Sequence, residues 1–413
     1  MPDTDPLIEY DVLIVGAGHA GTQVANELIG GGYPGSIGIL SAELHEPYER
    51  PPLTKGFLQG KTAEVELSLF VGGPGVSLHL GQQALGVDAV RRLVRTHDRE
   101  FRYGTLVWAT GGEARRLGVS GEELAGVHAL RTLDDARYAR EAMRPGTAYA
   151  IIGGGFIGLE SAAAFVAAGV DVTVLEAADR LLARVTSPDV SEFFLAEHRR
   201  AGVRIDLSAR ILGIEGADGR VTGVALGSGE VLPADRVLVG IGIVPNVAPL
   251  LDAGAAGGNG VEVDEHGATS LAGIYAVGDC SSFPFTQPPL QRLRLESIQN
   301  ASEQAKSVAA AILGRPLPYR PVPWFWSNQY DIKFKTVGIS SGYDEAVVRG
   351  NPAQRRFSVM YLRNGRALAV DSINSMKDYV DARSIVGRLL DRARLADPEA
   401  RLADAVIPER VSM

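Results

Sequence analysis

The chain has 413 residues, which suggests two or three domains, and its 46% hydrophobic and 22% charged residues are typical of a globular protein with a sizeable core. Its net charge of −8 disfavours a general nucleic-acid binder, and its single cysteine excludes a disulfide framework, a thiolate zinc site, an iron–sulfur cluster and a CxxC redox pair. The 49 glycines are about 12% of the chain against a usual ~7%, and they follow no collagen-like period, so the excess needs another explanation.

The N-terminal sequence favours a cytoplasmic protein. It has no basic region, and its apolar run is only about five residues long, which argues against a signal peptide. No stretch of the chain reaches the ~18 apolar residues of a membrane span. One thiol fits a reducing compartment, so we expect a cytoplasmic protein with no membrane, nucleic-acid or metal partner.

The first predicted unit is a strand, a glycine-rich turn, a helix and a second strand. The apolar, β-branched run 10–15 predicts a buried parallel strand. It enters a turn with Gly16, Gly18 and Gly21, followed by a helix to about residue 29. A second strand, 36–40, ends near Glu43.

The same pattern recurs later in the chain. A strand at 148–152 enters a turn with Gly153, Gly155 and Gly158, and a helix follows from 159 to about 168. The next strand, 170–175, ends at Glu176. The first glycines of the two turns are 137 residues apart (153 − 16), so the chain contains a repeated unit.

The repeated pattern predicts two dinucleotide-binding sites. The first glycine permits a tight turn, the second lets the backbone approach a pyrophosphate, and the third lets the helix pack on the strand. The closing acid accepts hydrogen bonds from ribose hydroxyls, and Glu43 and Glu176 follow the last glycine of their turns by 22 and 18 residues. One such turn is a weak signal, but two are a strong one; the alternative is a pair of glycine-rich turns without a ligand.

Three further predicted strands end in small residues, at 105–111, 236–242 and 274–279. Ligands of open α/β sheets bind at the carboxyl ends of strands, so these ends are candidate linings of the sites. Asp279 could accept a hydrogen bond from a polyol hydroxyl, although such a residue alone is more often a helix cap.

The order of these elements predicts an α/β protein with two nested Rossmann-like domains and a C-terminal α+β domain. The first domain comprises 1–112 and 244–322, and it encloses the second domain, 113–243. Four prolines between Pro316 and Pro323 mark the boundary of a third domain, 323–413. There the pattern predicts strands at 333–338, 357–362 and 367–374 before a helix at 384–393.

Seven segments then carry a family resemblance, at 46–55, 109–111, 130–136, 153–160, 276–280, 294–301 and 323–330. With them the chain resembles the FAD-dependent pyridine-nucleotide oxidoreductases, and among these the oxygenase-coupled NADH–ferredoxin reductases of the putidaredoxin reductase type. The resemblance covers nearly the whole chain. It implies that the first unit holds FAD and the second NAD(P)H.

The resemblance also implies the binding residues. For FAD they are Gly16, Gly18, His19, Ala20, Gly21, Glu43, Arg50, Lys55, Ala84, Ala109, Thr110, Gly111, Arg131, Gly278, Asp279, Ser297, Ile298 and Trp326. For NADH they are Gly153, Gly155, Phe156, Ile157, Gly158, Glu176, Arg184 and Gly242.

Three of the implied residues would serve the reaction itself. Lys55 and Glu160 would form an ion pair near N-5 of the flavin, and Trp326 would lie by the isoalloxazine. The alternative for the pair is a surface lysine and an unrelated glutamate on a helix face. The chain has Asn328 where the family usually has Asp, which changes the charge near the pyrimidine side of the flavin.

The cysteine count separates the relatives. Disulfide reductases of this superfamily need a CxxC beside the flavin, and the peroxidase and oxidase relatives carry a redox cysteine where this chain has 52–56. Cys280 is expected to be a small buried thiol. With flavin as its redox centre, the chain is expected to pass single electrons to a 2Fe-2S ferredoxin that serves a monooxygenase. The alternatives are another acceptor (rubredoxin, oxygen or a quinone-like molecule) and a flavin-bound redox sensor that uses NADH only to switch conformation.

The charges of the later part of the chain suggest where such an acidic ferredoxin docks. Residues 281–340 contain seven basic and three acidic residues (7 − 3 = +4), so a local basic face with Arg292, Arg294, Lys333 and Lys335 could steer it. An ordinary scatter of solvated charges is the alternative.

The residues at the end of the second repeated unit, and just after it, indicate whether NADH or NADPH binds. Glu176 favours NADH, because a carboxylate repels the 2′-phosphate of NADPH. Arg180 and Arg184 lie just downstream and could meet that phosphate, but we expect them at the NADH pyrophosphate or the surface.

Overall fold

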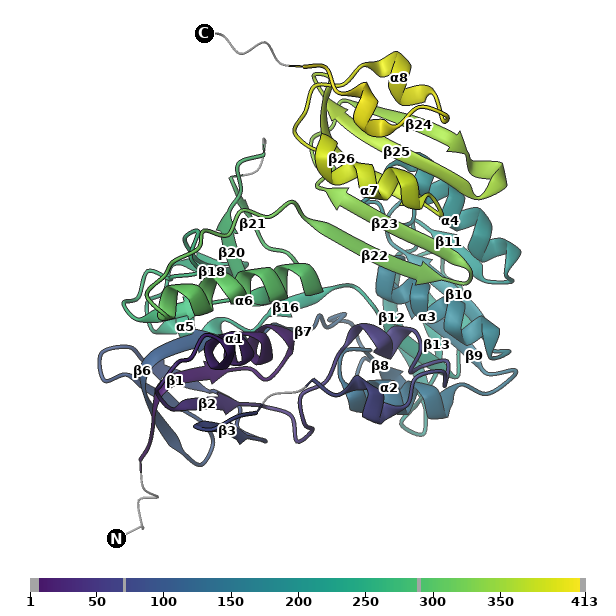
Figure 1. Ribbon diagram of the computed structural model, residues 1–413. Helices are drawn as coiled ribbons and strands as arrows, with labels where there is room; N and C mark the ends of the chain where they lie inside the picture. The colour runs from purple at the N-terminus through teal and green to yellow at the C-terminus, as the bar shows by residue number, and fades with distance from the viewer. Residues whose placement is uncertain (1–6, 70–71, 288–290, 409–413) are drawn as a thin grey trace. The chain divides into compact units, whose positions relative to one another are not determined.

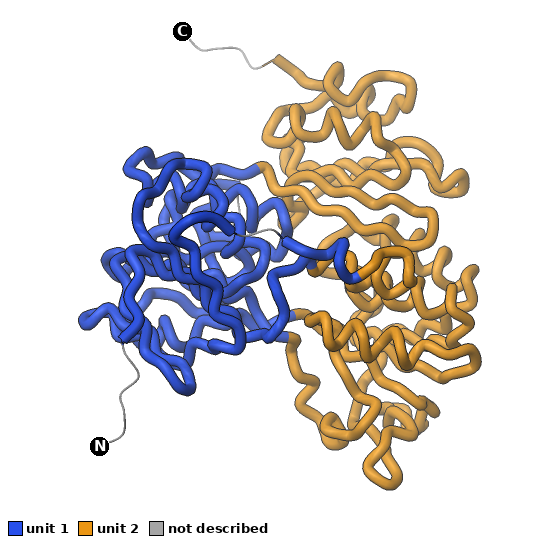
Figure 2. Tube along the Cα trace, turned by 60° about the horizontal axis from the view of Figure 1, so that its bottom comes forward, with its two compact units in different colours: residues 1–49, 64–113, 243–321 blue, residues 50–63, 114–242, 322–413 orange. Residues whose placement is uncertain are grey.

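The computed structural model describes residues 7–69, 72–287 and 291–408. These form two compact units, which Figure 2 colours separately: residues 1–49, 64–113 and 243–321 make the first, and residues 50–63, 114–242 and 322–413 the second. The chain therefore crosses between the units near residues 113, 242 and 321, and one short excursion, 50–63, belongs to the second unit. The division of the second unit into a nucleotide domain and a C-terminal domain stays a prediction.

The first unit is built on a seven-stranded sheet of order β3-β2-β1-β6-β5-β4, with β19 paired to β6 (Figure 1). Its strands are β1 (Ile8–Val15), β2 (Ile37–Leu40), β3 (Val76–His79), β4 (Gly86–Asp88), β5 (Leu93–Arg95), β6 (Glu100–Trp108) and β19 (Ile274–Ala276). β1, β2, β3, β6 and β19 pair in parallel, so their carboxyl ends lie along one edge.

The helices α1 (His19–Gly30) and α6 (Ile298–Ile312) lie side by side on this sheet (Figure 1). Val12 and Ile14 of β1, Val24 of α1 and Val308 of α6 are fully buried in their common core. Burial of such apolar area, at ~25 cal/mol per Å², is what fixes α1 directly behind the glycine-rich turn. The unit also contains α5 (Ala248–Asp252) and a small sheet of β17 (Gly257–Gly258), β18 (Gly260–Glu262), β20 (Ser281–Pro284) and β21 (Arg292–Leu293).

The second unit contains a parallel five-stranded sheet of order β11-β10-β9-β15-β8. Its strands are β8 (Val127–His128), β9 (Ala148–Ile152), β10 (Asp171–Glu176), β11 (Arg204–Leu207) and β15 (Arg236–Val239). The helices are α2 (Leu133–Ala142), α3 (Phe156–Ala167) and α4 (Pro188–Arg200), and an antiparallel sheet consists of β12 (Ile211–Ala217), β13 (Arg220–Leu226) and β14 (Val231–Pro233). The short strands β7 (Gly112–Ala114) and β16 (Ile243–Pro245) pair near the crossing points of the chain.

The C-terminal part of this unit is an antiparallel five-stranded sheet of order β22-β23-β26-β25-β24. Its strands are β22 (Trp324–Gln329), β23 (Ile332–Gly338), β24 (Glu345–Asn351), β25 (Arg356–Arg363) and β26 (Arg366–Ile373). One face packs on α3 and α4 through aromatic rings, such as Phe194 against Phe334 (5.9 Å between centroids). The other face packs on α7 (Met376–Ile385) and α8 (Arg392–Ala396).

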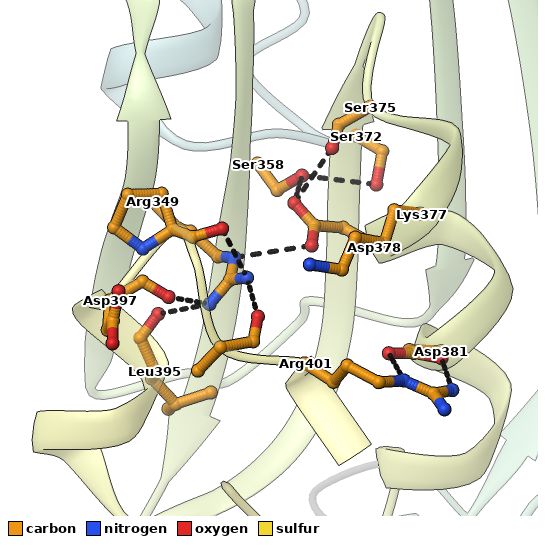
Figure 3. A network of polar contacts seen from close by, with 12 residues as sticks. Arg349, Ser358, Ser372, Ser375, Lys377, Asp378, Asp381, Leu395, Asp397 and Arg401 are labelled. Atoms are coloured by element: carbon orange, nitrogen blue, oxygen red, sulfur yellow. Dashed lines mark hydrogen bonds and ion pairs between the residues drawn. The ribbon is translucent and has the colours of Figure 1, made fainter. Parts of the chain in front are cut away.

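Two arginines hold the last described segment against this sheet (Figure 3). Arg349 of β24 is only 2% exposed; its Nε donates to Asp378 of α7 (3.2 Å), and its other nitrogens donate to the backbone carbonyls of Leu395, Asp397, Pro398 and Ala400. Arg401 makes a forked contact with Asp381 (2.7 and 3.3 Å).

The fold agrees with the α/β architecture expected from the sequence, with one wrong element. The helix predicted at 384–393 does not form: α7 ends at Ile385, and α8 begins only at Arg392. Gly387 has φ +83° and its N–H donates to the carbonyl of Ala367, so the chain turns back along β26, where Leu389 bridges Arg366. Leu390 is buried and bridges Val406 outside the sheet. The strands β22 and β24 were not predicted.

No helix among the described residues is long and apolar enough to cross a membrane. Within 7–69, 72–287 and 291–408, no group of three or more His, Cys, Asp and Glu side chains could hold a metal ion.

Candidate active site

The first glycine-rich turn joins β1 to α1 with almost no spare room. Gly16 has φ +112°, and a Cβ at this position would lie 2.2 Å from the carbonyl oxygen of Ala109. A Cβ at Gly21 would lie 1.9 Å from the carbonyl oxygen of Gly16. Any side chain at either position would separate the helix from the strand, so glycine is required by packing.

The second turn, between β9 and α3, repeats this geometry in the second unit. Gly153 has φ +113°, and its Cβ would lie 2.4 Å from the carbonyl oxygen of Gly240. A Cβ at Gly158 would lie 2.1 Å from the carbonyl oxygen of Gly153. The two turns thus have the same construction, as the repeated sequence predicts.

The middle glycines have a different role, because nothing lies near them. Apart from the adjoining backbone, a Cβ at Gly18 or at Gly155 would meet no atom of the described residues within 4 Å. These glycines are the N-caps of α1 and α3, they supply no capping side chain, and neither helix has an acid in its first turn. Each helix therefore presents uncapped N–H groups and its positive dipole end to open space, which fits the pyrophosphate of a dinucleotide.

His19 adds a polar group at the start of α1. Its Nε2 is 2.8 Å from Ser302 Oγ of α6, whereas its buried Nδ1 has no hydrogen-bond partner among the described residues. Burial, opposed by the charge of Glu49, lowers the pKa of His19, which keeps the ring neutral near pH 7. A neutral ring with an unused buried nitrogen can still donate to or accept from a bound ligand.

The two acids at the strand ends are held by hydrogen bonds. Tyr48 donates to Glu43 (2.6 Å) in the first unit. In the second unit Glu176 accepts from the backbone N–H groups of Gly154 (2.6 Å) and Ala178 (2.7 Å). Both carboxylates are thus held by hydrogen bonds, and that of Glu176 lies beside its glycine-rich turn, as a ribose acceptor needs to be.

The strand ends of the first unit meet the start of α1. Ala109 follows β6 and donates to the carbonyl of Val15, while Thr110 donates to the carbonyl of Asn246 (2.7 Å). Gly278, with φ +79°, lies so close to α1 that a Cβ would be 2.9 Å from that of Ala20. The structure therefore brings 109–111 and 278–279 together with the first glycine-rich turn.

Cys280 is a structural thiol, as expected. It is fully buried, and its Sγ donates to the backbone carbonyls of Val277 (3.3 Å) and Trp108 (3.5 Å). Burial raises the pKa of the thiol, so the reactive thiolate is disfavoured.

The predicted pair of Lys55 and Glu160 forms within the second unit. Lys55 Nζ lies 2.6 Å from Glu160 Oε2, and the two side chains are 20% and 1% exposed. Glu160 is on α3, which is buried along most of its length, so an unpaired carboxylate there would be very costly. The lysine is held from one side by the carboxylate and keeps part of its surface open, which suits a cation that acts on a ligand.

Other predicted flavin residues also belong to the second unit. Arg50 donates to the carbonyl of Arg131 (2.8 Å), and the N–H of Arg131 donates to Asp135 in the capping box of α2. Trp326 of β22 is partly exposed, and its ring lies 5.6 Å from that of Trp324. Asn328 is exposed on the same strand.

The remaining predicted residues are placed as follows. Ala84 lies between β3 and β4, Ser297 caps α6 by accepting from the N–H of Asn300 (3.1 Å), and Ile298 begins that helix. Phe156 and Ile157 begin α3, where Phe156 packs on Phe325 (4.8 Å) and Ile157 is 43% exposed. Gly242 has φ +97° after β15.

Arg180 has protein partners of its own. Its guanidinium donates to the carbonyls of Ala183 and Thr186 and to Ser191 Oγ (2.7–2.9 Å), so it holds the loop before α4 together, and its contact with a pyrophosphate stays a prediction. Arg184, by contrast, is exposed.

Two of the four residues of the expected basic face have internal partners. Arg292 donates to the carbonyls of Val263 and Ser282, and Arg294, with a side chain 14% exposed, pairs with Glu296 (2.8 Å). Lys335 lies over the ring of Tyr379 (4.4 Å), and Lys333 is exposed. Arg294 and Arg292 are therefore poor candidates for steering, and Lys333 is the best.

Sequence reasoning missed two further contacts of Glu160. Thr54 Oγ1 donates to its Oε2 (2.5 Å), and Ser327 Oγ donates to its Oε1 (2.6 Å). For Ser327 a signal existed: Ser327 and Gln329 alternate with Asn328 in the run 324–329, so the two polar residues share one face of a strand whose neighbours are aromatic.

Comparisons with known proteins give a consistent picture. The family model for the pyridine nucleotide-disulphide oxidoreductases matches residues 10–305, and the model described as Reductase C-terminal matches 324–406. The 5,5'-dehydrodivanillate O-demethylase ferredoxin reductase subunit of a Sphingobium strain is 46% identical over 403 residues, with 96% of this chain and 98% of the relative covered. A rubredoxin-NAD(+) reductase of Pseudomonas putida is 38% identical over 375 residues, with 89% and 96% covered.

A solved structure is similar over its full length. It is the covalent complex of putidaredoxin reductase with putidaredoxin, whose matching chain is 38% identical, with a TM-score of 0.90 and with 97% of this chain and 98% of that chain covered.

Proposed function

The chain belongs to the pyridine nucleotide-disulphide oxidoreductase family, and we propose that it carries electrons from NADH to a 2Fe-2S ferredoxin that feeds a monooxygenase. It is an FAD-dependent oxidoreductase with NAD(P)H as its other nucleotide. The observation that carries the proposal is the pair of equivalent glycine-rich turns, one in each unit, together with a lone cysteine that is buried.

We assign FAD to the first turn and NADH to the second. Gly18 and Gly155 leave room for the two pyrophosphates, and we expect Glu43 and Glu176, each held by hydrogen bonds, to accept from the riboses. When bound, FAD supplies the redox chemistry, because it accepts a hydride and releases electrons one at a time.

Lys55 would act on the flavin electrostatically. Its ammonium would stabilise the negative charge of the reduced ring, and Glu160 would keep it in place. Neither residue needs to transfer a proton. Trp326 would pack by the isoalloxazine as the third residue of this group.

A one-electron carrier is the acceptor that the chemistry favours. Cys280 is the single cysteine of the chain and is buried, so it cannot relay electrons as a dithiol would. The Sphingobium relative is named a ferredoxin reductase subunit, and the similar solved structure is a complex with putidaredoxin. A lone thiol and the use of NADH are compatible with the cytoplasm, where we propose that the enzyme works.

The test is a reconstitution with purified components. The FAD-loaded enzyme, NADH and a set of 2Fe-2S ferredoxins are mixed, and reduction of cytochrome c is followed. The proposal predicts that cytochrome c reduction requires a ferredoxin and is faster with NADH than with NADPH. Reduction that does not respond to any ferredoxin would contradict it.

Docking is tested by Lys333→Glu. Because Lys333 is an exposed cation, its reversal is expected to raise the apparent Michaelis constant for an acidic ferredoxin a few fold and to leave ferricyanide reduction unchanged. Arg294→Glu is not a suitable probe, since it would disturb an internal ion pair.

Rubredoxin is the second candidate acceptor, because a relative 38% identical to this chain is named a rubredoxin-NAD(+) reductase. The same assay with rubredoxin in place of ferredoxin decides between them.

A further inference from the structure

A series of hydrogen-bonded side chains within the second unit ends at the carboxylate of Glu160. From Glu160 the chain runs to Ser327 and Gln329 of β22, to His198 of α4 and to Tyr330 in the turn after β22. The distances are 2.6 Å from Ser327 Oγ to Glu160 Oε1, 3.1 Å from Gln329 Nε2 to Ser327 Oγ, 2.8 Å from His198 Nε2 to Gln329 Oε1 and 2.9 Å from Tyr330 Oη to His198 Nδ1.

Chemistry fixes the direction of every bond in this chain. An ionised carboxylate only accepts, so Ser327 must donate its one proton to Glu160, and its oxygen must then accept from the amide NH₂ of Gln329. The Gln329 carbonyl consequently faces His198, whose Nε2 must donate to it. The remaining nitrogen of a neutral imidazole accepts, so Tyr330 donates to Nδ1. All four bonds point toward Glu160, and aligned bonds of this kind polarise one another.

Burial keeps this arrangement in place. Ser327 and His198 are fully buried, and Gln329 is 1% exposed. Burial lowers the pKa of His198 to about 4, against the weaker effects of Gln329 and Glu197, so the ring is neutral near pH 7 as the bonding pattern requires.

Tyr330, at the far end of this hydrogen-bonded chain, has a strained backbone conformation. Tyr330 has φ +56°, a left-handed conformation that a bulky side chain rarely adopts. In this conformation its ring packs edge-on against His198 (5.1 Å) and its hydroxyl reaches Nδ1. Backbone strain of this kind persists where the surrounding structure demands it and is often found at functional sites.

We propose that Ser327, Gln329, His198 and Tyr330 are positioning residues for the ion pair of Glu160 and Lys55. They orient one oxygen of the carboxylate and disperse its charge, so that the other oxygen holds the Lys55 ammonium at a fixed place. The proposal rests on the proposed function only in that FAD binds beside Lys55. The Gln329 amide makes the chain unsuited to proton transfer, so its role is electrostatic and geometric.

The experiment measures the midpoint potential of bound FAD in the holoenzyme and in three variants. Ser327→Ala removes one donor to Glu160, and Ser327→Thr keeps it. Ser358→Ala is the matched control, because Ser358 is also buried and donates to a buried carboxylate, that of Asp378 (2.8 Å), which is paired with Arg349 instead of Lys55.

Ser327→Ala removes a hydrogen bond that disperses the negative charge of the Glu160 carboxylate, and it leaves the Lys55 ammonium less firmly placed. Both changes destabilise the negatively charged reduced flavin. We expect the reduced form to become about tenfold less stable relative to the oxidised form, a midpoint ~30 mV more negative for a two-electron couple. Ser327→Thr should restore the potential, and Ser358→Ala should leave it unchanged. An unchanged potential in Ser327→Ala, no rescue by Thr, or an equal shift in Ser358→Ala would overturn the proposal.

Tyr330→Phe keeps the proposal testable if Ser327→Ala does not retain FAD. It removes only the terminal hydroxyl and should shift the potential in the same direction, but by less than Ser327→Ala does. No shift in this variant would overturn the proposal in that case. The ¹⁵N spectrum of His198 adds a readout without redox chemistry, since the proposal requires the Nε2–H form and the Nδ1–H form would contradict it.

If the proposed function fails, the experimental result differs from the result that overturns this inference. A wild-type enzyme whose flavin is reduced by NADH but which does not reduce any ferredoxin would refute the acceptor and leave these potentials to be measured as before.

Discussion

The second unit contains two buried ion pairs that are alike in chemistry and different in what surrounds the cation. In each pair a carboxylate on a helix also accepts from a buried serine: Glu160 from Ser327 and Asp378 from Ser358. Arg349 is 2% exposed, and its guanidinium is used up by Asp378 and by backbone carbonyls of the last described segment. Lys55 is 20% exposed, and among the described residues its polar contacts beyond Glu160 are long, with the carbonyl of Pro51 (3.4 Å) and with Thr54 Oγ1 (3.3 Å).

The difference separates a structural pair from one available for chemistry. A guanidinium has five N–H donors, and in Arg349 they tie the chain end to the sheet, as Figure 3 shows. An ammonium on a flexible stem, held at one side, can still direct its charge at a bound ligand. The comparison predicts that disturbing the first pair costs stability and that disturbing the second costs reaction rate.

The largest expected effect is on stability, in Arg349→Met. The change leaves Asp378 buried without its cation and frees the carbonyls that the guanidinium held, so we expect a loss of about 3–5 kcal/mol in the free energy of unfolding of the second unit. Urea titration measures it. A loss below about 1 kcal/mol would mean that the ion pair of Arg349 and Asp378 does little to stabilise the second unit.

The next effect concerns pH and the chain of hydrogen bonds behind Glu160. Burial lowers the pKa of His198 from 6.5 to about 4. Between these values the unfolded state binds a proton that the folded state does not, so stability is lost as pH falls through this window, on the order of 3 kcal/mol in total.

The measurement compares the wild type with His198→Gln by urea unfolding at several pH values from 6.5 down to 4. Asp371 is also buried, which raises its pKa to about 7, and it contributes with the opposite sign, because its stabilising effect is lost as pH rises toward 7. The difference between the two proteins isolates His198 and should shrink as pH falls. A difference that does not change with pH would contradict a neutral, buried His198.

Glu160→Gln tests the pair that is available for chemistry. The amide keeps the shape of the side chain and removes the charge that holds Lys55, so flavin reduction by NADH should slow by about tenfold. Stopped-flow absorbance measures the rate. Asp378→Asn is the matched control and should lower stability while leaving the rate unchanged; equal slowing in both variants would remove the distinction between the pairs.

The smallest effect is expected at Arg401→Ala. Arg401 pairs with Asp381 on α7, the helix that also carries Asp378. The Arg401 side chain is 62% exposed, however, so water competes for its charge. Its removal should lower stability much less than Arg349→Met does in a thermal or urea unfolding experiment. A loss of stability comparable to that of Arg349→Met would show that the exposure of the arginine does not decide how strongly such an ion pair stabilises the protein.

The parts of the molecule that depend on local pattern could be predicted from the sequence. The two turns follow from glycine spacing, because Gly16 and Gly153 have no room for a side chain, and the short apolar runs became the strands β1, β9 and β15. The helix predicted at 384–393 failed because a positive φ at Gly387 and the pairing of Leu390 with Val406 overrode local helix propensity.

The parts of the site that depend on tertiary contacts could not be predicted. Arg180 reads as a phosphate ligand from its position after Glu176, and only the fold reveals that its donors are used by carbonyls in the loop before α4. His198 has no motif around it, and its connection to Glu160 through Gln329 and Ser327 exists only because β22 packs beside α3 and α4.

The most direct test of the central claim is an anaerobic experiment in which one equivalent of NADH reduces the FAD-loaded enzyme and an excess of oxidised 2Fe-2S ferredoxin is then added. The account predicts that the flavin is reoxidised and that two ferredoxins are reduced for each NADH, since a hydride carries two electrons and each cluster accepts one. A flavin that stays reduced in the presence of every 2Fe-2S ferredoxin tried, and is reoxidised only by oxygen or a quinone, would contradict it.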